Sequence, residues 1–248
     1  MLACVLTTSA SVRFTVWANA MLSGGTDPDT AARRILGDDV GHHVAGLPDH
    51  PAPVTLPVAL NLLRTAGGRQ AHLALPVPGD PIGLAGPPPF NEVALEAGEA
   101  VIVRGTDLGL VPAYVGPAVQ WTAHLAAPPA HADLGEADRG LRAALITAAE
   151  ALAALDVARW NPDVADALMD IRKIGSGRGD DLAPGYDPRA VRTAATARRC
   201  LAIAEAALAD DGGAISVTDA DARRRTVLQL ATAARRALVA ACGPPAVG

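Results

Sequence analysis

The sequence of 248 residues predicts an α+β fold, with a small mixed β-sheet and helices in the N-terminal half and an antiparallel α-helical bundle in the C-terminal half. Short apolar or alternating runs, which are typical of strands, occur up to about residue 127. Beyond residue 135, apolar positions recur every three or four residues, as in helices. Half of the residues are hydrophobic but only 3% are aromatic, so the core depends on many small side chains in close contact.

Three helices are predicted before the first clear strand. Apolar side chains from Phe14 to Leu22 recur at helical spacing. Asp27-Pro28 predicts the start of a second helix, because aspartate caps helix N-termini and proline fits the first turn. A third helix is predicted behind Thr55, with a stripe made of Leu56, Ala59, Leu60 and Leu63.

Four strands are predicted, at 70–75, 99–104, 108–115 and 119–125. In the last of these, Val119 and Trp121 alternate with Gln120, Thr122 and His124, which predicts a sheet with one solvated face. Pro112 has no N–H to donate, so the strand at 108–115 is expected near an edge of the sheet.

The C-terminal half predicts four helices, at 135–159, at 162–174, from Pro188 to before Gly212, and from Thr218 to before Gly243. Each long helix has one apolar stripe, so we expect an antiparallel bundle. The segment at 127–130, APPA, predicts a boundary between a sheet-containing domain at 1–127 and a helical bundle at 131–248. The pattern leaves open whether the two pack as one unit.

Charge and cysteine content exclude several classes of function. A formal net charge of −5 gives no long-range attraction to a polyanion, so no nucleic-acid partner is expected. The three cysteines, Cys4, Cys200 and Cys242, lie far apart and predict neither a disulfide framework nor a thiolate metal site. The N-terminal segment lacks the basic start of a signal peptide, and no apolar run is long enough to span a bilayer. We therefore expect a cytoplasmic protein that makes no membrane contact.

The segment at 76–90, PVPGDPIGLAGPPPF, contains six prolines and three glycines. Repeated prolines make a segment stiff, so we expect an ordered loop that the buried ring of Phe90 anchors. In one interpretation Gly79 and Asp80, just past a buried strand, contact a ligand together with Asn91 and Glu99. In the other, Asp80 only closes a turn before Pro81.

The segment at 37–50, GDDVGHHVAGLPDH, contains three aspartates and three histidines. Asp38 and His42 are four residues apart, as are Asp39 and His43, so on a helix each pair could offer ligands to a divalent ion. The alternative is a polar helix end followed by solvated histidines. The spacing matches no established ligand signature, so we assign no metal site and no cofactor.

The sequence contains two neighbouring segments, LPVPGDPIGL at 75–84 and ALEAGEAVIV at 94–103, and a third, ALAALDVARW, at 151–160. Together they resemble an uncharacterised protein family of high-GC Gram-positive bacteria, over most of the chain. The resemblance implies a bacterial setting and no particular activity.

The sequence does not determine the function. It contains no GxSxG, HExxH, P-loop or EF-hand pattern. The leading hypothesis is a non-catalytic cytosolic protein that binds another protein or associates with itself. The alternative is a small-molecule-binding protein or enzyme with a pocket near the 76–90 loop, lined by Gly79, Asp80, Asn91 and Glu99.

Overall fold

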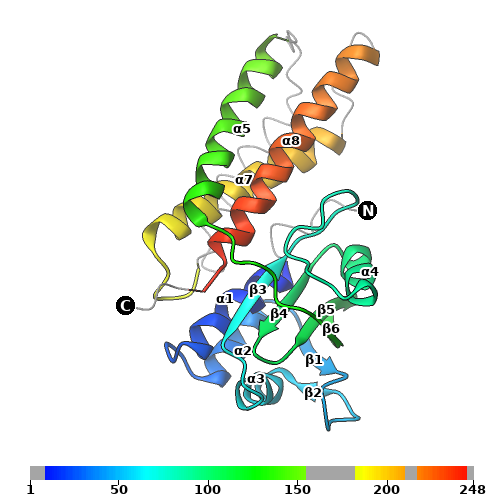
Figure 1. Ribbon diagram of the computed structural model, residues 1–248, viewed down its shortest axis with the longest axis vertical. Helices are drawn as coiled ribbons and strands as arrows, with labels where there is room; N and C mark the ends of the chain where they lie inside the picture. The colour runs from blue at the N-terminus through cyan, green and yellow to red at the C-terminus, as the bar shows by residue number, and fades with distance from the viewer. Residues whose placement is uncertain (1–8, 155–181, 210–216, 245–248) are drawn as a thin grey trace. The chain divides into compact units, whose positions relative to one another are not determined.

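The computed structural model describes residues 9–154, 182–209 and 217–244, and the chain divides into two compact units (Figure 1). The sheet unit consists of Ser9–Ala132, the segment Leu182–Pro188 and the chain from Cys242. The helical unit contains the long helices that follow Ala132. The α+β class predicted from the sequence is therefore confirmed.

The described residues of the sheet unit form a mixed sheet of six strands, in the order β2-β1-β6-β5-β4-β3. Only β1 and β6 pair in parallel, and the other neighbours are antiparallel. The strands are β1 (Gly41–Ala45), β2 (Val54–Thr55), β3 (Gln70–Ala74), β4 (Ala100–Arg104), β5 (Leu108–Val115) and β6 (Ala118–Leu125).

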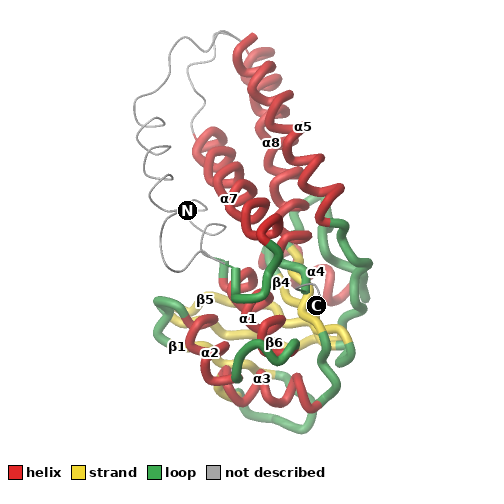
Figure 2. The backbone as a smooth tube through the Cα atoms, turned by 90° about the vertical axis from the view of Figure 1, so that its left-hand side faces the viewer, coloured by secondary structure: helices red, strands yellow, loops and turns green. Residues whose placement is uncertain are grey.

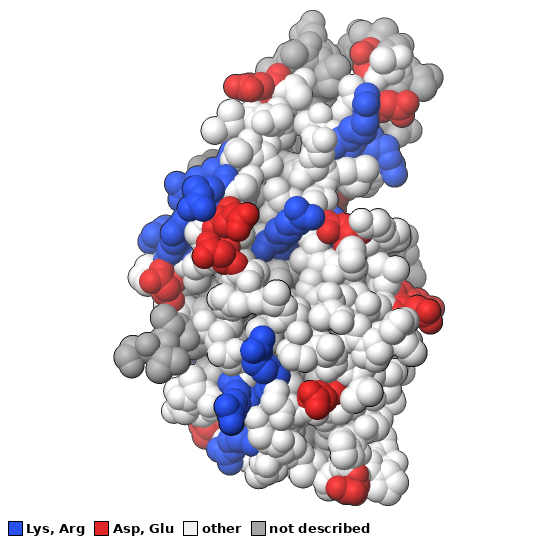
Figure 3. Space-filling view, in the orientation of Figure 1, with Lys and Arg blue, Asp and Glu red and all other residues white. Residues whose placement is uncertain are grey.

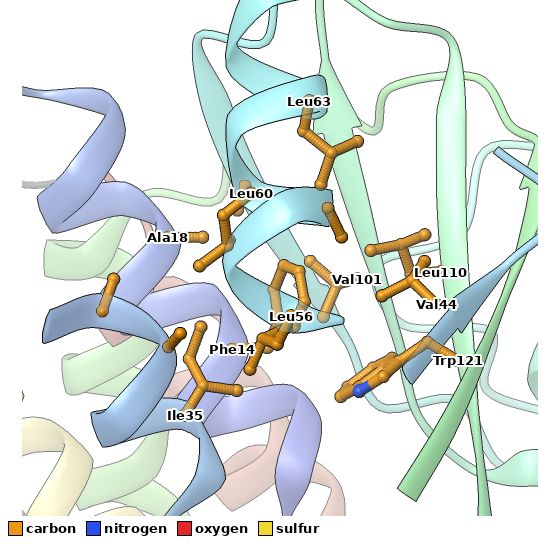
Figure 4. Close-up of a cluster of buried hydrophobic side chains, with 14 of the residues drawn as sticks. Phe14, Ala18, Ile35, Val44, Leu56, Leu60, Leu63, Val101, Leu110 and Trp121 are labelled. Atoms are coloured by element: carbon orange, nitrogen blue, oxygen red, sulfur yellow. The ribbon is translucent and has the colours of Figure 1, made fainter. Parts of the chain in front are cut away.

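In the part of the chain that the structure describes, the sheet is covered by α1 (Ala10–Leu22), α2 (Pro28–Leu36), α3 (Leu56–Thr65) and α4 (Pro88–Ala97). The first three bury their apolar sides against one face of the sheet (Figures 2 and 4). There the rings of Phe14 and Trp121 lie 4.9 Å apart between centroids. On the other face, α4 packs Phe90 and Ala94 against Ile102. As predicted, Asp27 caps α2, and its Oδ1 accepts a bond from the Thr30 N–H at 2.8 Å.

The prediction that 108–115 lies near an edge is wrong, because β5 pairs with β4 on one side and with β6 on the other. Pro112 fits there for a local reason. Pairing between β4 and β5 stops at Val101 and Leu110, so Pro112 has only β6 as a neighbour, opposite Trp121. Strands β1 and β2 and helix α4 were not predicted.

The helical unit contains α5 (Leu134–Ala154), α7 (Pro188–Ala209) and α8 (Val217–Ala241). Helices α5 and α8 run side by side in opposite directions (Figures 1 and 2). The predicted stripe of α8 is buried at Val227, Ala231, Ala234, Leu238 and Ala241. The stripe predicted for α7 is buried at Ala190, Ala194, Ala197, Leu201 and Ala204, but its last member, Leu208, is only half-buried. The helix predicted at 162–174 lies outside the described residues.

A buried carboxylate joins two helices of this unit. Asp138 of α5 accepts bonds from the Arg189 guanidinium, at 3.1 Å from Nη2, and from the Thr193 hydroxyl at 3.2 Å, both on α7. These bonds, together with the charge of Arg142, lower the pKa of Asp138 although its burial acts in the opposite direction. None of the described helices is both long and apolar enough to cross a membrane.

Candidate functional site

Two segments that the sequence analysis singled out meet around the first turns of α1. Glu99 precedes β4, Asp39 lies between α2 and β1, and His42 lies on β1. Hydrogen bonds connect all three to α1 or to the strands beside it. We call this group the α1 cluster, and it consists of Ser9, Ser11, Arg13, Asp39, His42, Glu99, Tyr114 and Trp121.

Glu99 lies at the N-terminus of α1 and is fully buried. Its Oε2 accepts bonds from the Ser9 hydroxyl and from the Ser11 backbone N–H at 3.0 Å. Its Oε1 accepts a bond from the Tyr114 hydroxyl at 2.7 Å. Burial, and secondarily the charge of Glu99, raises the pKa of Tyr114, so the phenol keeps its proton. The carboxylate therefore occupies the place where the N-terminus of α1 attracts an anion.

His42 lies on β1 and bonds through both ring nitrogens. The indole Nε1–H of Trp121 donates to His42 Nδ1 at 3.2 Å, and His42 Nε2 lies 3.0 Å from Asp39 Oδ2. Since an indole only donates, Nδ1 must be the acceptor and Nε2 must carry the proton of a neutral ring. Burial lowers the pKa of His42, although the neighbouring Asp39 partly opposes this change.

The Asp39 carboxylate also binds the guanidinium of Arg13, whose Nε donates to the backbone oxygen of Ile35 at 2.9 Å. Arg13 therefore connects α1 to the end of α2 and to the start of β1. The described arrangement is a chain of four side chains, from Arg13 through Asp39 and His42 to Trp121. These four side chains bond to one another, and Arg13 also bonds to the backbone of Ile35.

These contacts limit what the α1 cluster can do chemically. General-base catalysis needs a ring nitrogen that can reach a substrate proton, but both nitrogens of His42 already have partners. The Ser9 hydroxyl donates to Glu99 and accepts a bond from the Val12 N–H at 3.3 Å. The contacts of the cluster hold α1 in position against the sheet.

The helical pairing considered for Asp38, Asp39, His42 and His43 is wrong, because both histidines lie on a strand. Successive strand residues point to opposite faces, so His42 is buried and His43 is exposed. Asp39 contacts His42 and not His43. Within the described ranges, no three side chains of His, Cys, Asp or Glu gather in a way that could hold a metal ion.

The 76–90 loop is ordered, and Phe90 is buried, as predicted. Val77 and Asp80 exchange both backbone hydrogen bonds across Pro78 and Gly79, and Gly79 has a φ of 84°. This pattern is typical of a type II turn. The Leu75 N–H then donates to the Ile82 oxygen at 3.2 Å, so the loop folds back along β3. The Asn91 Oδ1 accepts a bond from the Gly86 N–H at 3.1 Å and holds the end of the loop.

The comparison with known proteins bears on both units. Residues 11–137 match the model of the Rv1486c-like protein N-terminal domain, and residues 135–239 match that of the C-terminal domain. The chain belongs to the Rv1486c-like family. No solved structure matches it.

Curated relatives of this Rv1486c-like chain come from mycobacteria. The uncharacterized protein Rv1486c of Mycobacterium tuberculosis is 31% identical over 277 aligned positions, which cover 93% of this chain and 95% of that protein. The uncharacterized protein MAV321 of Mycobacterium avium is 32% identical and covers 73% of each chain. These findings confirm the resemblance to an uncharacterised family of high-GC bacteria.

Sequence analysis missed several polar residues that organise this Rv1486c-like sheet unit. Arg13 contacts Asp39, which lies 26 positions away in the chain. Tyr114 contacts Glu99, which lies 15 positions away. Asn19 bonds to β3 across 52 positions. A polar residue within an apolar helical stripe is the one local signal that marks Asn19, because a buried polar group needs a partner.

Proposed function

We propose that this Rv1486c-like protein is a non-catalytic protein of the bacterial cytoplasm that associates with itself through one end of its sheet. The side chains of Arg13, Asp39, His42, Glu99 and Tyr114 in the α1 cluster bond within the fold, which favours a structural role over catalysis, although no described partner reaches the buried Ser11 hydroxyl. Cys200 is a free, buried thiol, which suits a reducing compartment.

The proposed contact surface is the apolar end of the sheet, where Val40 is exposed and where Tyr114 and Val115, as successive residues of β5, expose side chains on opposite faces. Their exposed fractions are 76%, 50% and 61%. The Val40 N–H donates to the Pro117 oxygen at 2.8 Å, so Val40 lies beside the hairpin that joins β5 to β6. Neighbouring exposed apolar side chains mark interaction sites, and a small surface of this kind suits a weak, transient contact.

The apolar character of Val40, Tyr114 and Val115 supports contact with a second copy. Charged side chains are scattered over the face of the molecule seen in Figure 3, with uncharged surface between them. In a symmetric dimer the same apolar side chains of both copies would meet.

The test is sedimentation velocity of the full chain over a series of concentrations. We expect the wild type to form dimers as concentration rises and a Val40→Asp/Val115→Asp variant to remain monomeric. Val58→Asp is the matched control, because Val58 is also exposed (44%) but lies on α3. A wild type that stays monomeric and captures no other protein would contradict the proposal, whereas capture of another protein that needs Val40 and Val115 would assign the surface to that partner.

The alternative function is small-molecule binding near the 76–90 loop, at Gly79, Asp80, Asn91 and Glu99. The position of Gly79 and Asp80 just beyond buried β3 favours it. The structural roles of Asn91 and Glu99 weigh against it, because both side chains already accept bonds from the protein. Thermal shifts across a metabolite panel that Asp80→Ala abolishes would favour this pocket over self-association.

A further inference from the structure

One buried histidine has a ring nitrogen that the fold does not use. His72 lies in the middle of β3, is 7% exposed, and pairs with Ile102 of β4. Its Nε2 is buried, and no hydrogen-bond partner reaches it among the described residues. Buried polar atoms are normally paired, so an unpaired one calls for an explanation such as a missing ligand.

The strand register brings an arginine to the same face as His72. Gln70 pairs with Arg104 and His72 pairs with Ile102, and alternate residues of a strand point the same way. The side chains of His72 and Arg104 are therefore diagonal neighbours on adjacent strands. Arg104 is exposed at the end of β4, where its guanidinium can meet a solute.

The segment after β6 brings a second basic group. Arg104 Nη2 donates to the Pro129 oxygen at 3.3 Å, and the Ala127 N–H donates to the Gly86 oxygen at 2.8 Å. These bonds hold the segment beside the sheet, and exposed His131 follows two residues after Pro129.

Among the described residues, the two groups whose charge acts on His72 are both basic. Burial is the main reason that the pKa of His72 falls to about 4, and the charges of Arg104 and His131 lower it further. No carboxylate contributes to this change. An oxyanion at this place would balance the charge of Arg104 and would accept a bond from the unused nitrogen of His72.

We infer that His72, Arg104 and His131 form a binding site for a small oxyanion that carries a phosphate group. The guanidinium of Arg104 matches two oxygens of such a group. A neutral His72 donates through Nε2–H, and His131 adds a further donor. Both inorganic phosphate and a phosphate ester present these oxygens. This site is independent of the apolar end of the sheet.

The experiment is isothermal titration calorimetry of the full chain with inorganic phosphate and with glycerol phosphate, at constant ionic strength. We expect binding of at least one probe and a loss of about tenfold in affinity for Arg104→Gln. His131→Ala should also weaken binding, and because His131 is exposed this variant should fold normally. His43→Ala is the matched control, since His43 is exposed on β1, and its affinity should equal that of the wild type.

A second measurement follows the His72 ring by NMR. Bound phosphate should move the His72 ring resonances and raise the pKa of His72, because an anion favours the charged ring. The proposal is overturned if neither probe binds, if Arg104→Gln and His131→Ala bind as tightly as the wild type, or if the His72 resonances do not move at saturation.

Discussion

The indole N–H of Trp121 determines which form of His42 the sheet unit contains. A protonated imidazole has two donors, so the ring cannot accept the Trp121 bond once it takes up a proton. The alternation in β6 predicts that Trp121 is buried, and it is. Its partner could not be predicted, because His42 lies 79 positions away and the parallel pairing of β1 with β6 has no local signal.

We expect the stability of the protein to fall as the pH drops below about 6.5, the ordinary pKa of histidine. The native pKa of His42 is lower than this value, so in that range the unfolded chain binds the proton first. The stability that depends on the neutral His42 ring is fully present above pH 6.5 and is lost as the pH falls toward the native pKa of His42. It amounts to at most about 1.4 kcal/mol for each unit of pH.

Urea unfolding at a series of pH values checks this expectation. His42→Gln, whose amide can bond to Trp121 and Asp39 without titrating, should show a smaller loss of stability than the wild type between pH 6.5 and 5. His43→Gln removes an exposed histidine from the same strand and should behave like the wild type. Equal pH dependence in the His42→Gln variant and the wild type would contradict this account of His42.

At the scale of elements, helices could be predicted from the sequence where an Asp-Pro pair marks the N-terminus and apolar residues then recur every three or four positions. Asp27-Pro28 and Asp187-Pro188 each precede a helix, and the stripe of α8 and most of the stripe of α7 are buried as expected. The short strand β1 carries two histidines and a glycine in five residues, so it lacks the apolar run that signals a strand. Helix α4 begins within three successive prolines, which hid its start.

The 76–90 loop protects an edge of the sheet. β3 is the last strand, and unpaired edges attract other strands. The bond from Leu75 to Ile82 continues the pairing beyond β3 within the same chain. Composition predicted that this loop is stiff and ordered, but its return to β3 depends on contacts that no local pattern encodes.

Two glycines of this loop provide a matched test. Gly79 and Gly83 have nearly equal positive φ angles, 84° and 83°. A Cβ at Gly83 would lie 2.6 Å from the Ala74 Cα, whereas a Cβ at Gly79 would meet nothing within 4 Å. Both alanine variants place a side chain at a positive φ angle, which lowers the free energy of unfolding by a similar amount in each. Gly83→Ala should lower it by about 1–3 kcal/mol more, because its Cβ is forced against β3. Urea unfolding measures the free energy of unfolding of both variants. Equal losses would show that Gly83 is not closely packed against β3.

At the scale of the whole chain, one side chain connects four distant segments. Asn19 of α1 pairs with the backbone of Ala71 on β3, with its Oδ1 2.7 Å from the N–H and its Nδ2 2.9 Å from the oxygen. Its Nδ2 also lies 3.4 Å from the Tyr186 hydroxyl and 3.3 Å from the Cys242 oxygen. The sequence pattern predicted two halves, but it did not predict that Leu182–Pro188 and Cys242 belong with the sheet unit.

Asn19→Ala should lower the free energy of unfolding by about 2–4 kcal/mol, because it leaves the N–H and oxygen of Ala71 buried without their partner. Asn19→Asp keeps the volume but cannot donate to the Ala71 oxygen, so it should also be destabilising. Asn61→Ala is the control, since Asn61 bonds within α3 and is only half-buried. Urea unfolding followed by circular dichroism measures all three, and a neutral Asn19→Asp would refute the role of the donor.

The Tyr186 hydroxyl donates to the Cys242 oxygen at 3.2 Å, just before α7 begins and just after α8 ends. This bond therefore holds together the two ends of the stretch that carries α7 and α8, whatever the length of the helices between them. The same stretch also contacts α5, because α8 packs against α5 and α7 bonds to Asp138. A change in the length of α7 or α8 would leave the Tyr186–Cys242 bond in place but would have to preserve these contacts with α5.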